Sequence, residues 1–237
     1  MRGPVETLLF DFGGTLDADG VAWKERFYAY YRAEGLDMTA EAFAPVFYAA
    51  DDPLMGTLPA DADLSDTAYR LAANLEDQLA RRSGVVQSDA RRGRRIAARF
   101  LRDASAALVR NRAVLEALAK RYRLGVVANF YGNLEAVCRS AGLASLFPAI
   151  VDSTRVGAEK PSEAIFRAAL ERLLAAPDKT LLIGDSLRRD REGARRMRMG
   201  FVWIAPPEAQ ATERRTAGAR PDHPTIERLG ALAEMLL

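Results

Sequence analysis

Several residue types and patterns are scarce in this chain, and each scarcity excludes a class of protein. Among the 237 residues there is one cysteine, Cys138, so no internal disulfide framework can form, and a lone thiol in a helical pattern predicts a small core residue. No apolar run approaches the roughly 18 residues of a membrane span. Residues 1–6 lead straight into a short apolar run and are unlike a secretory signal. We therefore expect a cytoplasmic protein with no membrane partner.

Neither sign of charge dominates. The chain has 34 basic and 32 acidic residues, a formal net charge of +2, so nothing in the composition demands a nucleic-acid partner. The run 91–95, rich in arginine, lies in a helical pattern with acidic neighbours, which favours a solvated helix face over a polyanion site. Because nearly all basic residues are arginine, each lysine is informative; the lysines are Lys24, Lys120, Lys160 and Lys179.

Short apolar runs that end at a polar residue recur along the chain. The runs and the residues that follow them are Leu8–Phe10 with Asp11, Leu124–Ala128 with Asn129, Ala149–Val151 with Asp152, and Leu181–Ile183 with Gly184 and Asp185. Such runs are typical of buried parallel strands, and strands alternating with helices predict a doubly wound, Rossmann-like parallel sheet of the α/β class. Ligands of such sheets bind outside the carboxyl ends of the strands, so Asp11, Asn129 and Asp185 are expected to converge.

The strand pattern disappears between residues 19 and 106. Helical periodicity replaces it, with helices expected at 22–34, 39–48, 65–82 and 89–106 and a break rich in Pro, Gly and Asp at 51–63. We predict a helical cap subdomain of residues 19–106 inserted into an α/β core of residues 1–18 and 107–237. Its aromatic side chains, at helical spacing, should form the core of the cap. The polar stretch Pro206–Pro224 is the candidate linker.

Four local patterns carry chemistry. Phe10-Asp11-Phe12-Gly13-Gly14-Thr15-Leu16 places a carboxylate at a strand end, where it could attack phosphorus and form an acyl phosphate. Three further patterns follow in order: Leu124–Asn129, Gly157-Ala158-Glu159-Lys160-Pro161, and Gly184-Asp185-Ser186 with Asp190. Together they resemble the four signatures of the haloacid dehalogenase superfamily, hydrolases with a Rossmann-like core and a helical cap.

The resemblance implies a role for each matching residue. Asp11 would be the nucleophile, and Lys160 the cation that neutralises it and holds the transferring phosphoryl oxygens. Thr15 and Asn129 would also bind the substrate phosphate. The implied substrate is a small phosphorylated metabolite; the oligomeric state stays open.

The resemblance also implies a magnesium cofactor. Mg²⁺ prefers hard oxygen ligands in an octahedral arrangement, with positions left for water and substrate phosphate. Its ligands would be the Asp11 carboxylate, the Gly13 backbone carbonyl and Asp185, supported by Asp190.

Two positions depart from the family pattern. Gly13 stands where the phosphatases usually have an aspartate that serves as general acid and then as general base, a function worth ~10² to 10⁴ in rate. Ala128 stands where a hydroxyl usually binds a phosphate oxygen, and the Asn129 amide is a partial substitute. Asp17 and Asp19 are candidate replacement acids, although both also suit a turn.

Three functions therefore stay open. The first is a phosphatase that relies on an activated leaving group, or on an acid from the substrate or cap. The second is a carbon–halogen or carbon–phosphorus hydrolase, since these relatives also lack the second aspartate; Asp185 and Asp190 argue against a metal-free dehalogenase, and Lys24 is the only cap lysine for a Schiff base. The third is a catalytically weak binding protein, against which Asp11 and Lys160 speak.

Overall fold

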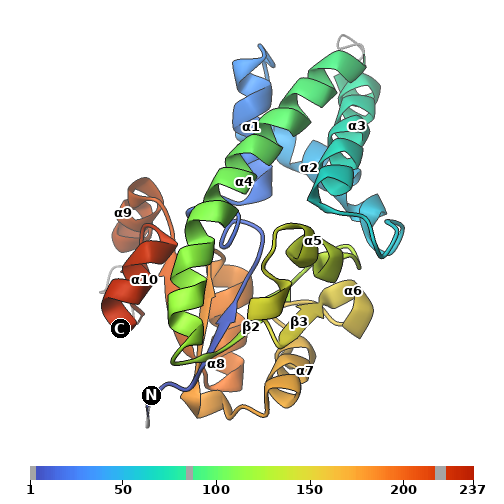
Figure 1. The fold of residues 1–237 in the computed structure, drawn as a ribbon. Coiled ribbons are helices and arrows are strands. Elements are labelled where there is room, and N and C mark those ends of the chain that lie inside the picture. Colours follow the sequence, from blue (N-terminus) through green and yellow to red (C-terminus); the bar gives the residue numbers. More distant parts are fainter. Residues whose placement is uncertain (1–3, 84–87, 217–222) are drawn as a thin grey trace.

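The core of the protein is one parallel sheet built from the apolar runs (Figure 1). The computed structural model describes residues 4–83, 88–216 and 223–237. Within them, six strands lie in the order β3-β2-β1-β4-β5-β6, all paired in parallel. The strands are β1 Thr7–Phe10, β2 Arg123–Ala128, β3 Ala149–Asp152, β4 Thr180–Gly184, β5 Gly200–Ile204 and β6 Thr225–Ile226. The predicted doubly wound α/β sheet is confirmed.

Strands β5 and β6 extend the sheet beyond the four predicted runs. The β5 run is a short apolar segment that no polar residue of the predicted site follows, and periodicity alone does not separate such a run from a buried helix segment. β6 has only two residues and exists through its pairing: the Trp203 amide donates to the Pro224 carbonyl at 3.0 Å, and the Ala205 amide donates to the Ile226 carbonyl at 3.0 Å. Tertiary hydrogen bonds, rather than composition, define this edge of the sheet.

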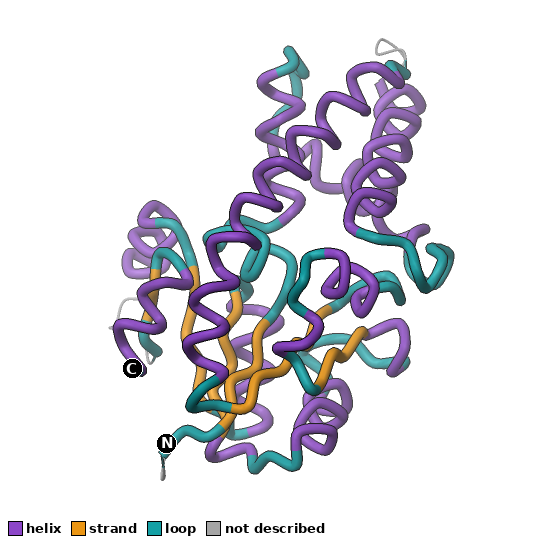
Figure 2. The backbone as a smooth tube through the Cα atoms, viewed as in Figure 1, coloured by secondary structure: helices purple, strands orange, loops and turns teal. Residues whose placement is uncertain are grey.

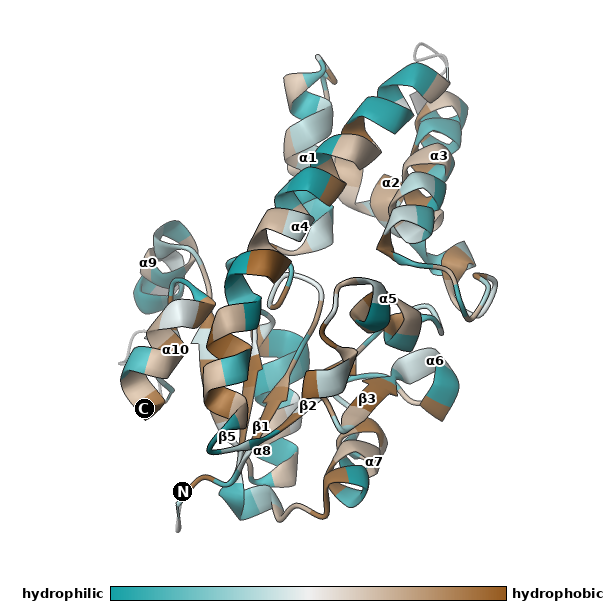
Figure 3. Cartoon of the chain, viewed as in Figure 1, coloured by the Kyte–Doolittle hydropathy of each residue, from teal (hydrophilic) through white to brown (hydrophobic). Residues whose placement is uncertain are grey.

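Helices cover both faces of the sheet. Successive side chains of a strand point to opposite sides, so Leu8 and Phe10 lie in one apolar cluster and Leu9 lies in the other. The first face packs against α4 Ala90–Ala119, α5 Leu134–Ser140 and α10 Leu229–Leu236, and the second against α7 Glu163–Leu173 and α8 Glu192–Met197. Figure 3 shows the strands as apolar ribbons among these helices. Burial on both faces explains why the strands are continuous apolar runs.

The inserted region stands beyond the strand ends and, in its described part, consists of helices and loops (Figure 2). It contains α1 Trp23–Ala33, α2 Ala40–Asp51 and α3 Leu64–Ser83, and then the first part of α4. The four expected helices are present. Helix α4 continues to Ala119, so the expected cap boundary after residue 106 falls inside one continuous helix, which packs against α3 in the cap and against α10 in the core.

Aromatic side chains form the core of the cap, as expected from their spacing. Phe27, Tyr31 and Phe43 are fully buried. Phe27 stacks on Phe100 of α4 with 5.0 Å between ring centroids. Tyr48 and Tyr69 are exposed, with 47% and 41% of their surfaces accessible.

Two smaller expectations concern the surface and the single thiol. Cys138 is buried in the core, as predicted. The arginine run lies on a helix face: Arg92 pairs with Glu76 at 2.7 Å, and Arg95 pairs with Glu34 at 2.6 Å. Arg91, Arg94 and Arg95 are exposed, as expected for a solvated helix face, whereas Arg92 is partly buried beside Glu76.

The expected linker Pro206–Pro224 is in large part structured, which corrects that prediction. Residues Pro207–Thr216 form helix α9, and Ala209 packs against the core; residues 217–222 lie outside the described part. The polar composition reflects one exposed helix face. Among the described helices, none combines the length and apolar character needed to cross a membrane; the location in the cell stays a prediction.

Candidate active site

The site lies where the strand order reverses. β1 occupies the middle of the sheet, with β2 and β3 on one side of it and β4, β5 and β6 on the other. Connections leave in opposite directions from β1 and β4, and this opens a crevice at their carboxyl ends. Asp11 directly follows β1 and Asp185 directly follows β4. Two acids about 170 residues apart in the chain are therefore neighbours in space.

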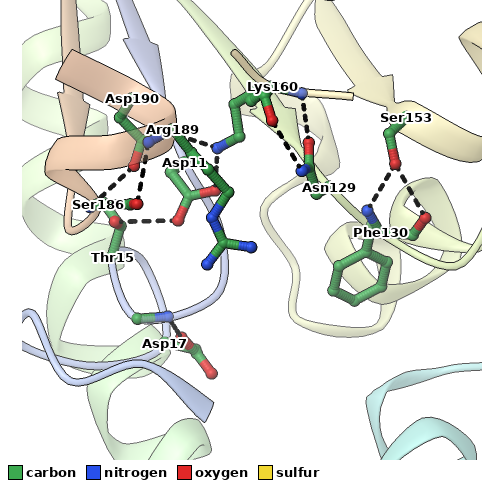
Figure 4. A network of polar contacts seen from close by, with 11 residues as sticks. Asp11, Thr15, Asp17, Asn129, Phe130, Ser153, Lys160, Ser186, Arg189 and Asp190 are labelled. Atoms are coloured by element: carbon green, nitrogen blue, oxygen red, sulfur yellow. Dashed lines mark hydrogen bonds and ion pairs between the residues drawn. The ribbon is translucent and has the colours of Figure 1, made fainter. Parts of the chain in front are cut away.

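Lys160 bridges two carboxylates in this crevice (Figure 4). Its Nζ lies 2.5 Å from Asp11 Oδ1 and 2.7 Å from Asp190 Oδ1, and all three side chains are buried. Burial alone would lower the pKa of Lys160, but the charges of Asp11 and Asp190 outweigh it, and the pKa is raised. Lys160 is thus held as a cation against Asp11, at the position that the sequence predicts for it.

Asp185 adds a third carboxylate to the cluster. One oxygen each of Asp11, Asp185 and Asp190 lies within 4.8 Å of the others. Burial, followed by the charges of Asp11 and Asp190, raises the pKa of Asp185 well above its usual range. Three carboxylates lie around the Lys160 ammonium, and protonation of Asp185 or a bound cation relieves their mutual repulsion. An all-oxygen donor set of this kind fits a hard divalent cation such as Mg²⁺.

The loop after β1 can form only with glycine at position 14. Gly14 has a φ of 94°, in the left-handed region, and a Cβ there would collide with the Asp185 carboxylate. The amide of Gly14 donates to Asp17 Oδ1 at 2.7 Å, which fixes the turn. Glycine therefore lets the Asp11 loop approach the Asp185 carboxylate closely.

Thr15 and Asn129, predicted to bind phosphate, contact Asp11 and Lys160 respectively. The Thr15 hydroxyl donates to Asp11 Oδ2 at 3.2 Å. The Asn129 side chain accepts from the Lys160 amide at 2.7 Å and donates to the Lys160 carbonyl at 3.3 Å. Asn129 thereby fixes the Lys160 backbone, and contact of either residue with phosphate stays a prediction.

The indole of Trp23 occupies the space beside Gly13. A Cβ at Gly13 would lie 3.3 Å from Trp23 Nε1, and the φ of Gly13 is not in the left-handed region. Trp23 Nε1 donates to Asp17 Oδ2 at 2.7 Å, and Arg26 donates to the same oxygen at 2.8 Å. Figure 4 shows Asp17 turned away from Asp11. The position of the family acid is thus filled by a cap side chain.

Neither of the two replacement acids considered from the sequence faces the site. Both oxygens of Asp17 are engaged by the Gly14, Trp23 and Arg26 donors, and burial raises its pKa although these donors and the Arg26 charge oppose the shift. Asp19 pairs with Arg110 at 2.7 Å on the surface. The turn interpretation of both residues is supported by these contacts.

A cavity of about 540 Å³ lies between the strand ends and the cap. Gly13, Asn129 and Lys160 line it from the core. Most of the other lining residues were not among the predicted site residues, and these include Asp51, Tyr131, Arg188 and Arg189. Of these four, only Arg189 carried a local signal, because it directly precedes Asp190 in the fourth pattern; Figure 4 shows its side chain extending past Asp11. The charges of Asp11, Asp190 and Asp185 raise the pKa of Arg189 against the opposing effect of burial.

A doubly wound sheet with a helical cap and an acid cluster at its switch point defines a class of capped α/β hydrolases. The model of the haloacid dehalogenase-like hydrolase family matches residues 5–198, and the chain belongs to that family.

Three comparisons illustrate the relationship. The chain is 31% identical to haloacid dehalogenase-like hydrolase domain-containing protein 3 of Bos taurus over 185 residues, 75% of this chain and 72% of that protein. It is 33% identical to phosphoserine phosphatase of Thermus thermophilus over 100 residues, 41% of this chain and 36% of that protein. A crystal structure of a dehalogenase with an intermediate complex superposes with a TM-score of 0.61 at 18% identity, over 100% of this chain and 99% of that one. The structural likeness shows the fold alone.

Proposed function

We propose that the protein is a magnesium-dependent phosphatase that uses Asp11 as nucleophile and acts on a small phosphorylated metabolite. The observation that carries the proposal is the buried Asp11–Lys160–Asp190 contact next to Asp185, since Lys160 also lines a cavity of small-molecule size. A nucleophilic carboxylate needs a nearby cation to lower repulsion from a phosphate anion, and Lys160 is that cation.

The chemistry follows from these positions. Asp11 Oδ attacks phosphorus, the bond from phosphorus to the ester oxygen breaks, and an acyl phosphate forms on Asp11; water then releases inorganic phosphate and restores the carboxylate. Thr15, which donates to Asp11 Oδ2, orients the nucleophile. Lys160 and Arg189 stabilise charge on the transferring oxygens.

Asp11, the Gly13 carbonyl and Asp185 would hold Mg²⁺, with Asp190 in support. When bound, the ion offsets the negative charge of the carboxylates and of the phosphate. The donor set fits because the three carboxylates approach one another within 4.8 Å around a single lysine.

The named relatives support a phosphatase. A curated relative with a matching segment is a phosphoserine phosphatase. The acid cluster at the site argues against a dehalogenase mechanism that needs no metal, as the sequence already indicated.

Carbon–phosphorus hydrolysis is the second candidate, and one observation favours it. Lys24, the only lysine of the cap, lines the same cavity as Gly13 and could form a Schiff base with a carbonyl-bearing phosphonate. Its Nζ lies 3.1 Å from Glu25 Oε1, so the amine is engaged in an ion pair instead of being free to attack a carbonyl. The phosphatase proposal therefore has the stronger support.

The test is a substrate screen with Mg²⁺ that runs phosphate esters beside carbonyl-bearing phosphonates and haloacids. Release of phosphate from esters, abolished in Asp11→Asn and unaffected by Lys24→Met, is the expected result. Turnover of phosphonates that requires Lys24 would establish the second candidate instead. Halide release in the presence of a chelator would overturn both.

A further inference from the structure

Two carboxyl groups of the cap line the cavity, and among the described residues one of them has no ion pair, whereas Glu25 pairs with Lys24. Asp51, the last residue of α2, lines the cavity together with Gly13 and Lys160. It thus approaches from the side opposite to the strand ends. A group in this position lies next to the part of a substrate that leaves, because the core holds the phosphoryl group.

Tyr131 holds Asp51 in place from the core. Tyr131 belongs to the loop after β2, and its hydroxyl donates to Asp51 Oδ1 at 2.5 Å. Its buried ring packs on Phe130 and Trp23, with centroid distances of 4.9 and 6.0 Å. Trp23 in turn fills the space beside Gly13. The same aromatic layer that fills the usual position of the acid therefore supports a carboxyl group elsewhere in the cavity.

One oxygen of Asp51 is left for a substrate. Tyr131 engages Oδ1, and among the described residues none donates a hydrogen bond to Oδ2. This differs from Asp17, whose two oxygens accept three short hydrogen bonds. Asp51 has a positioned carboxyl and an open oxygen, which is the arrangement that proton transfer requires.

We propose that Asp51 is the general acid and base of this site, supplied by the cap, and that Tyr131 is its positioning residue. The inference rests on the proposed phosphatase function. It assigns to α2 the proton transfer that Gly13 cannot perform.

The two steps balance as follows. In the first, Asp11 forms a bond to phosphorus, the bond from phosphorus to the ester oxygen breaks, and the Asp51 carboxyl gives its proton to that oxygen, so an alcohol leaves. In the second, the Asp51 carboxylate takes a proton from water as the water oxygen attacks phosphorus. The bond from phosphorus to Asp11 then breaks, and inorganic phosphate departs.

The electrostatics of the cavity suit this cycle. Burial raises the pKa of Asp51 to about 6; the Tyr131 hydrogen bond lowers it, the Asp52 charge raises it and the Arg189 charge lowers it. A carboxyl with this pKa is available in both protonation states near neutral pH. The other charged groups that line the cavity are Lys24, Glu25, Glu159, Lys160 and Arg188.

The test compares Asp51→Asn, Tyr131→Phe and the control Asp52→Asn on a series of phosphate esters with Mg²⁺, from nitrophenyl phosphate to ethyl phosphate. Proton donation matters most for the poor leaving group. Asp51→Asn should lower kcat/KM for ethyl phosphate by ~10² to 10⁴, and for nitrophenyl phosphate by less than about tenfold. Asp52 is exposed and does not line the cavity, so Asp52→Asn should keep the dependence on leaving group.

The pH profile separates chemistry from structure. The acid must be protonated for the first step, so kcat/KM for ethyl phosphate should fall as pH rises through about 6, the pKa of Asp51. In Asp51→Asn this fall should vanish. In Tyr131→Phe, which keeps the ring, loss of the hydrogen bond should move the fall to higher pH; in Asp52→Asn it should move slightly to lower pH.

The second step gives an independent measurement. If Asp51 is also the base, Asp51→Asn should accumulate the phosphorylated enzyme, detected in quenched samples by mass and by its sensitivity to hydroxylamine. Folding of each variant is checked by its melting temperature, and Tyr131→Phe provides the test if Asp51→Asn does not fold.

The outcomes distinguish the two proposals. An unchanged leaving-group dependence and pH profile in Asp51→Asn, with activity still abolished in Asp11→Asn, would overturn the role of Asp51 and leave the phosphatase intact. Ester hydrolysis that survives in Asp11→Asn, or no hydrolysis of any ester by the parent protein, would overturn both.

Discussion

Two buried aspartates, six residues apart in one loop, have opposite surroundings. Asp17 accepts hydrogen bonds from Gly14, Trp23 and Arg26, each within 2.8 Å, so both of its carboxylate oxygens have partners. Asp11 shares Lys160 with a second carboxylate and lies near a third. Around Asp17 the negative charge is matched by the Arg26 guanidinium, and this pair joins the core loop to the cap. At Asp11 three carboxylates, its own included, lie close to one lysine. This arrangement suits the binding of a cation beside an anionic substrate.

The largest difference should appear in activity. Asp11→Asn removes the nucleophile but keeps the shape, so phosphate release should fall by at least about a thousandfold while the melting temperature changes little. Steady-state kinetics beside a thermal melt measures both. Turnover within tenfold of the parent would contradict the assignment of Asp11.

Substitution of Asp17 should change the free energy of unfolding. Asp17→Ala leaves the buried Arg26 guanidinium without its partner, and we expect a loss of about 3–5 kcal/mol in the free energy of unfolding. The matched control is Asp19→Ala in the same loop, whose pair with Arg110 is exposed and worth about 0–1 kcal/mol. Urea unfolding of both variants gives the comparison, and equal losses would show that the Asp17 cluster has no special structural role.

Magnesium should reverse which of two proteins is the more stable, the parent or Asp185→Asn. Its pKa is raised in the fold, so the ionised carboxylate opposes folding, and metal-free protein should lose stability as pH rises through that pKa. Without Mg²⁺, Asp185→Asn should melt at or above the parent temperature. With Mg²⁺ at 100 times its Kd, the parent should gain about 2.7 kcal/mol and the variant much less. Equal shifts in both proteins would place the ion elsewhere.

The smallest effect concerns Gly13. Its φ permits a side chain, but the new Cβ would press on the Trp23 indole at 3.3 Å, which should cost about 1–3 kcal/mol of stability. Gly13→Ala should show this cost without a gain in rate. Gly13→Asp should change ethyl phosphate turnover by less than about tenfold in the parent, yet raise it by at least about tenfold in Asp51→Asn. Lack of rescue would mean that the two positions do not serve the same proton.

The sequence predicted the strand ends that form the acid cluster better than it predicted the wall of the cavity. Apolar runs ending in Asp11, Asn129 and Asp185 defined the central strands, because the burial of parallel strands leaves a direct mark on composition. β6 left no such mark, since it depends on backbone pairing with β5. The convergence of the strand ends followed from topology alone.

The cavity wall could not be predicted in the same way. Asp51 lies in a break rich in Pro and Asp, where a carboxylate is ordinarily a turn former, and only its contact with Tyr131, 80 residues later, distinguishes it. Trp23 was expected among the cap core, and it is buried there, but its position over Gly13 depends on how the cap sits on the core. Contacts between subdomains are long-range, and periodicity does not report them.

Helix α4 runs through both cap and core and connects them as one continuous helix. Its 30 residues form a rod about 45 Å long, with one end packed on α10 and the other on α3. A rod of that length amplifies rotation: a tilt of about 10° at the core end would carry the far end roughly 8 Å. The Asp17 contacts with Trp23 and Arg26 join the loop after β1 to helix α1 of the cap, so a large tilt would have to break them. A glycine placed in the middle of α4, between its two packed ends, would weaken this link between cap and core without touching Asp51 or the nucleophile.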